Sequence, residues 1–118
     1  DPDIRMQSYL EAICYEKLGR RLEAKSLQDE IINYTELHYA ESGKTFNNLL
    51  ALHILRQRGE TESANLLVKK LKEPDTYAKP TQQWIVAYFT NDTATCRKLE
   101  KDLSKNAYYM LLKSALNM

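Results

Sequence analysis

Apolar residues recur every three or four positions along most of the chain, and short polar or glycine-containing segments interrupt them. This spacing places apolar side chains on one face of an α-helix, whereas a half-buried strand alternates apolar and polar positions. The clearest stripe is formed by Ala24, Leu27, Ile31, Tyr34 and His38. The pattern predicts seven helices, at about residues 3–18, 20–39, 45–58, 60–72, 81–90, 92–105 and 107–118.

Residues that favour turns separate these predicted helices. Gly19 and Gly59 each follow a helical stripe, where a left-handed conformation ends a helix. Pro74 cannot continue a helix, so residues 73–80 are expected to form a loop. Asp92 and Asn106 stand where a side chain can accept hydrogen bonds from the first turn of the next helix.

Composition supports the same fold class. The 118 residues include 17 Leu and 10 Ala but only 2 Val and 6 Ile, and β-branched residues are the ones enriched in strands. Three Gly and three Pro are too few for the many hairpins of an all-β domain. We therefore expect an all-α fold. A chain of 118 residues usually forms one domain, so a single domain is expected.

The three tight turns share one pattern. Each has Gly or Asn at the turn, a small residue five positions later, and apolar residues three and seven positions beyond the small one. The turn residues are Gly19, Gly59 and Asn91, and the small residues are Ala24, Ala64 and Cys96. A small side chain lets two antiparallel helices approach closely, so the pattern predicts stacked helical hairpins.

This pattern resembles the tetratricopeptide repeat (TPR), and residues 12–32, AICYEKLGRRLEAKSLQDEII, are most similar to it. The resemblance implies a right-handed superhelical stack of about three antiparallel hairpins at residues 4–41, 45–73 and 81–105, followed by a C-terminal helix at 107–118. The sequence departs from the family at Ser8 and Asn48, where a large apolar residue is usual. Trp84 stands where the family prefers Gly or Ala.

TPR-like domains bind peptides or partner proteins on a concave face lined by the first helix of each hairpin. The resemblance therefore implies a non-catalytic interaction or scaffolding module whose concave groove binds a protein or peptide through apolar anchors and a polar rim. The matching positions in this chain are Tyr9, Ile13, Glu16, Lys17, Leu49, His53, Arg56, Gln57, Ile85, Tyr88 and Phe89. Alternatively, the chain is a structural or oligomerisation segment that packs on an adjoining domain or on a second copy of itself.

The last predicted helix is apolar around most of its circumference, and Lys113 is its only charged residue. A terminal helix of a repeat array normally presents a polar outer face. Two explanations follow: the helix wedges between the last hairpin and the loop at 74–80, or one stripe contacts another chain, for example in a homodimer. The candidate oligomer surface consists of Tyr108, Leu111, Ala115 and Met118.

Charge and hydropathy exclude several partners. The formal net charge is +1, and the lysines and arginines at 69–72 and 97–105 are interrupted by acidic residues, so we expect a solvated face and no nucleic-acid binding. No apolar run approaches the roughly 20 residues that a membrane-spanning helix requires, so no membrane insertion is expected.

Catalytic and cofactor motifs are not found. The sequence has no glycine-rich phosphate loop, and its two histidines, His38 and His53, lie on different predicted helices without a third metal ligand. Cys14 and Cys96 are expected to be buried and reduced. We therefore expect no enzyme activity, no cofactor and no metal; an enzyme would require a deep polar pocket around His53, Arg56 and Tyr88. The chain begins without Met, so we expect a segment of a larger protein, bacterial in overall character, whose localisation stays open.

Overall fold

The computed structural model describes residues 2–41, 43 and 45–118, and all regular secondary structure in these ranges is helical. It confirms the predicted all-α class. The helices of the described residues are α1 (Arg5–Lys17), α2 (Arg21–His38), α3 (Asn48–Gln57), α4 (Thr61–Leu71), α5 (Pro74–Tyr77), α6 (Pro80–Phe89), α7 (Thr93–Leu103) and α8 (Ala107–Leu116).

The hairpins α1/α2, α3/α4 and α6/α7 turn through one shared backbone motif. Gly19, Gly59 and Asn91 have φ angles of 76°, 73° and 60°. In each turn the following N–H donates to the carbonyl oxygen five residues earlier: Arg20 to Tyr15 at 2.8 Å, Glu60 to Leu55 at 2.9 Å and Asp92 to Ala87 at 2.8 Å. These are Schellman-type helix ends, so the sequence pattern correctly located the three turns.

Replacing Gly59 with alanine is expected to lower the free energy of unfolding by about 1 kcal/mol, because a Cβ atom disfavours positive φ. Gly59→Asn is the matched control and is expected to cost less, since Asn91 adopts the same conformation in the third turn. Urea denaturation of both variants measures the difference. Equal losses for alanine and asparagine would contradict this explanation.

The segment between α4 and α6 differs from the expected loop because it contains the one-turn helix α5. Pro74 is its first residue, where a missing N–H costs nothing and the fixed φ suits a helix. The amides of Thr76 and Tyr77 donate to the Glu73 carbonyl at 3.0 and 2.8 Å. The proline that ends α4 therefore also begins the next helical turn, as Pro80 does for α6.

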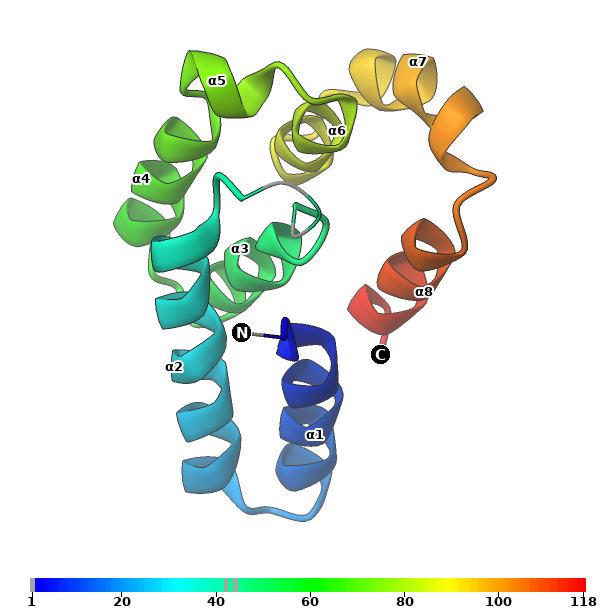
Figure 1. Ribbon diagram of the computed structural model, residues 1–118. Helices are drawn as coiled ribbons and strands as arrows, with labels where there is room; N and C mark the ends of the chain where they lie inside the picture. The colour runs from blue at the N-terminus through cyan, green and yellow to red at the C-terminus, as the bar shows by residue number, and fades with distance from the viewer. Residues whose placement is uncertain (1, 42, 44) are drawn as a thin grey trace.

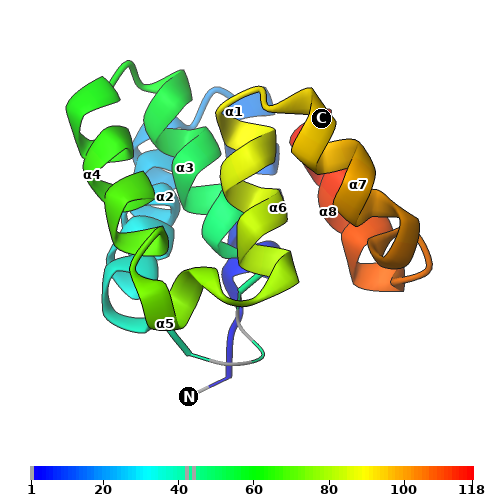
Figure 2. The ribbon, with the colours of Figure 1, turned by 90° about the horizontal axis from the view of Figure 1, so that it is seen from above.

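Helix α3 lies at the centre of the fold. The hairpins pack in chain order, with α2, α4 and α6 in close contact with α3 and α1 also touching it. Helices α2 and α4 lie on one side of α3, and α8 lies on the opposite side (Figures 1 and 2). The central position explains why most of α3 is buried. Its buried residues are Asn48, Leu49, Leu50, Ala51, Leu52, Ile54 and Leu55.

The small residues of the repeat pattern differ in burial. Ala24 and Ala64 are buried, with 1% and 3% of their surface exposed, and Cys96 is half-buried. Cys14, which the sequence predicts to be buried, is exposed. The α1 stripe faces inward through Met6, Tyr9 and Ala12, and Cys14 lies outside it.

Candidate functional site

Eight of the eleven residues assigned to the concave face line two hollows that meet at Leu116, near the carboxyl end of α8. The remaining three, Leu49, Ile85 and Phe89, are buried in the core and offer a partner almost no surface. Side chains from the first helices of the three hairpins, α1, α3 and α6, therefore line these two hollows. Their outward side is partly covered by α8.

The first hollow, here called the α1 hollow, has a volume of about 240 Å³. It is lined by Tyr9, Ala12, Ile13, Glu16, Lys17, Gln28, Gln57, Leu116 and Met118. Gln28 donates to the Glu16 carboxylate at 3.1 Å and accepts from the Arg58 guanidinium at 3.1 Å. Apolar side chains and a fixed polar rim thus surround the same space.

The second hollow, the α7 hollow, has a volume of about 480 Å³. It is lined by His53, Arg56, Ala87, Tyr88, Asn91, Thr93, Cys96, Arg97, Glu100, Leu116 and Asn117. The Arg56 guanidinium lies 3.8 Å from the Phe89 ring centroid and donates to the Phe89 carbonyl. This contact fixes Arg56 at the wall of the hollow.

Two groups of the α7 hollow, Cys96 and His53, have pKa values shifted in the direction that favours their neutral forms. Burial raises the pKa of the Cys96 thiol, and the Glu100 and Asp92 carboxylates act in the same direction. Burial and the positive charge of Arg56 lower the pKa of His53. Because the thiolate is the reactive form of cysteine, the raised pKa makes Cys96 a weaker nucleophile than an ordinary exposed thiol.

His53 is expected to make the fold less stable as the pH falls below about 6.5, its ordinary pKa. Its pKa is lower in the folded chain, so the unfolded chain binds the proton more readily in that range. His53→Gln is expected to reduce the difference in unfolding free energy between pH 7.5 and 5.5, whereas His38→Gln retains the His53 contribution. Urea titrations at both pH values test this, and an unchanged difference in His53→Gln would contradict it.

Helix α8 packs into the chain's own core with one face and exposes the other. Its inner residues Tyr109, Leu112, Ala115 and Leu116 are buried. On the outer side, Met110, Leu111 and Met118 are 60%, 46% and 66% exposed. Of the candidate oligomer surface, therefore, Leu111 and Met118 are accessible, but Ala115 is not, and Tyr108 is half-buried.

The inner face of α8 contacts α6 and α7. The Tyr109 ring meets the Trp84 ring edge-on at a centroid distance of 4.9 Å. Lys113 lies 3.9 Å from the Glu100 carboxylate, which also accepts a hydrogen bond from the Trp84 indole at 3.3 Å. Burial, together with Glu100, raises the pKa of Tyr109. The helix lies apart from α5 in both views (Figures 1 and 2).

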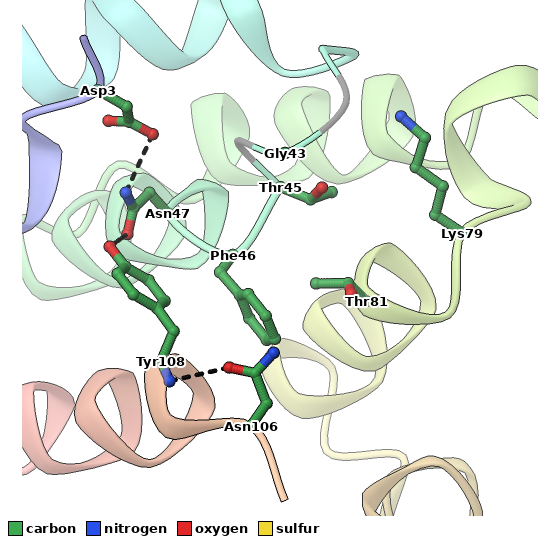
Figure 3. Close-up of a pocket in the computed structure, with 9 residues that line it drawn as sticks. All are labelled: Asp3, Gly43, Thr45, Phe46, Asn47, Lys79, Thr81, Asn106 and Tyr108. Atoms are coloured by element: carbon green, nitrogen blue, oxygen red, sulfur yellow. Dashed lines mark hydrogen bonds between the residues drawn. The ribbon is translucent and has the colours of Figure 1, made fainter. Parts of the chain in front are cut away.

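A third pocket, of about 530 Å³, lies at the other end of α8 (Figure 3). Its lining residues are Asp3, Gly43, Thr45, Phe46, Asn47, Lys79, Thr81, Asn106 and Tyr108. The Tyr108 hydroxyl donates to Asn47 at 2.5 Å, and Asn47 donates to Asp3 at 3.0 Å. Asn106 caps α8 by accepting from the Tyr108 amide at 2.8 Å, as the sequence predicts.

A buried polar network continues from this pocket into the core. The Arg5 guanidinium, 2% exposed, donates to Asp3 at 2.8 Å, to Thr35 at 2.8 Å and to Asn48 at 2.9 Å. Asn48 in turn donates to Gln82 at 3.2 Å. Burial acts to raise the pKa of Asp3, but hydrogen bonds from Arg5 and Asn47 outweigh it, so the net pKa is lowered.

This network is not predictable from local sequence patterns, although one residue points to it. Asn48 stands where the repeat resemblance expects a large apolar residue, and a polar residue at a buried position needs hydrogen-bond partners. The partners of Asn48 are the Arg5 guanidinium, the Tyr39 carbonyl and the Gln82 side chain, which no local pattern connects. Ser8, the other departure, is also buried.

Comparisons with protein-family models, with curated proteins and with solved structures give no match to this chain. Within the described residues, none of the helices combines the length and the apolar character needed to cross a membrane. The same part of the chain contains no group of three or more His, Cys, Asp and Glu side chains arranged to hold a metal ion.

Proposed function

We propose that this chain is a non-catalytic, TPR-like protein-binding module, with its hairpins stacked as a right-handed superhelix. The observation that carries the proposal is the convergence of α1, α3 and α6 on the two hollows beside Leu116. Apolar walls with a charged rim are typical of surfaces that bind a peptide through a few anchors. The partner is a protein or peptide segment.

Peptide display against the immobilised full chain tests this function. Ile13 and Lys17 line the α1 hollow, and Ile13→Glu with Lys17→Glu changes its shape and charge without touching the central helix. Selected peptides are expected to bind this variant roughly tenfold more weakly, a loss of about 1.4 kcal/mol. Leu22→Glu with Leu66→Glu is the matched control, since both leucines are exposed on α2 and α4. Selected peptides that bind all three chains equally would refute the proposed surface.

The outer face of α8 supports a second candidate function. Met110 and Leu111 are large apolar side chains left exposed on this helix, and exposed apolar patches often mark association surfaces. The alternative proposal is a structural segment that packs on an adjoining domain or forms a homodimer through α8. Light scattering across a concentration series is expected to show a dimer that Met110→Glu with Leu111→Glu abolishes. A monomer at every concentration would exclude the homodimer.

A further inference from the structure

Helix α8 covers the side of the molecule on which the proposed partner would bind. Its anchors Tyr109, Leu112 and Leu116 are buried, and they are spaced by three and four residues along one helical face. Tyr109 packs on Trp84 of α6, whereas Leu116 lies between the α1 and α7 hollows. The surface that α8 covers, together with these two hollows, is here called the α8-binding surface.

The attachment of α8 depends on side chains more than on close backbone packing. Among the described residues, the closely packed helix pairs join hairpin partners and successive hairpins, and α8 is in none of them. Its polar ties include the Tyr108–Asn47 hydrogen bond, a hydrogen bond between Tyr109 and Glu100, and the Lys113–Glu100 pair. The Lys113–Glu100 pair is partly exposed and therefore contributes little. A connection of three residues, 104–106, joins α8 to α7.

A helix of ten residues is marginal in water by itself, so α8 is ordered chiefly by the surface on which it lies. That surface extends beyond α8, because hollows of about 240 and 480 Å³ remain on either side of Leu116. A longer amphipathic helix would fill the space that α8 leaves open. The α8-binding surface thus accommodates a helix, and α8 does not fill it completely.

We propose that α8 is a built-in, displaceable occupant of this surface, and that the partner is an amphipathic helix carrying an aromatic residue followed by leucines three and seven positions later. This inference rests on the proposed binding function and adds that α8 regulates the binding of the partner. While α8 is docked, its short connection gives it an effective concentration in the millimolar range, so a partner must compete with it. Substitutions in α8 that weaken its docking therefore expose the α8-binding surface, while the residues of α1, α3, α6 and α7 stay unchanged.

Binding of a fluorescein-labelled peptide of residues 106–118 to the full chain tests the inference. Leu112→Ala with Leu116→Ala changes only α8, and this variant is expected to bind the peptide at least about tenfold more tightly than the wild-type chain. Met110→Ala with Leu111→Ala on the outer face is the matched control and is expected to bind as the wild type does. The same peptide with alanine at both leucines is expected not to bind.

Trp84, the only tryptophan, reports release of α8 because it is fully buried against Tyr109. Its emission is expected to shift to the red in the Leu112/Leu116 variant and to return when the peptide binds. If circular dichroism shows that the double variant has lost its helices, Leu116→Ala alone replaces it, with a smaller gain expected in the same direction.

Two outcomes would overturn the inference. Equal peptide affinity for wild type and variant would show that α8 does not compete, and no binding after Trp84 has become exposed would show that the surface does not take a helix from outside. A different result would refute the proposed peptide-binding function itself. In that case no displayed peptide would lose affinity when Ile13 and Lys17 are replaced, whether or not α8 is docked.

Discussion

Replacing Arg5 with methionine is expected to lower the free energy of unfolding by about 3–5 kcal/mol. The guanidinium is buried and donates to Asp3, Thr35 and Asn48, which come from three different segments. Methionine fills a similar volume but donates no hydrogen bond, so it leaves buried acceptors unpaired. Native domains of this size are stabilised by about 5–15 kcal/mol, so the loss is a large share of the total.

Urea denaturation of Arg5→Met beside Arg21→Met measures this loss. Arg21 is exposed at the start of α2, and its replacement is expected to change stability by no more than about 0.5 kcal/mol. Arg5→Lys keeps the charge but cannot reach three acceptors at once, so an intermediate loss is expected. If Arg5→Met were as stable as Arg21→Met, the buried network would have no energetic role.

Leu50→Ala is expected to cost about 2–5 kcal/mol, because it opens a cavity in the central helix. The Leu50 side chain is fully buried in α3, where helices on several sides prevent the structure from closing around the gap. Thermal and urea denaturation both report the loss.

Leu66→Ala provides the matched comparison for Leu50→Ala, since the chemical change is identical and Leu66 is 62% exposed on α4. A change within about 0.5 kcal/mol is expected there. Similar losses at the two positions would contradict the central placement of α3.

The sequence was sufficient to predict the helices and turns because those features depend on neighbouring residues. Positive φ at Gly19, Gly59 and Asn91 and the caps at Asp92 and Asn106 follow from local chemistry. The one helix it did not predict, α5, arises because proline both ends a helix and suits the first position of another.

The candidate site was predictable only in part. The repeat spacing could not separate side chains that line a hollow, such as Ile13, from core side chains such as Leu49 and Ile85. The position of α8 was not predictable either. Nothing local in residues 107–118 specifies this position, since the contacts that hold α8 come from Asn47, Trp84 and Glu100.

The docking of α8 on the inner helices is tested most directly by nuclear Overhauser contacts in the intact chain. The rings of Trp84 and Tyr109 are 4.9 Å apart between centroids, and they come from helices α6 and α8. Cross-peaks between the indole protons of Trp84 and the ring protons of Tyr109 are predicted. Their absence, with Tyr109 ring protons showing contacts only within residues 107–118, would contradict the account.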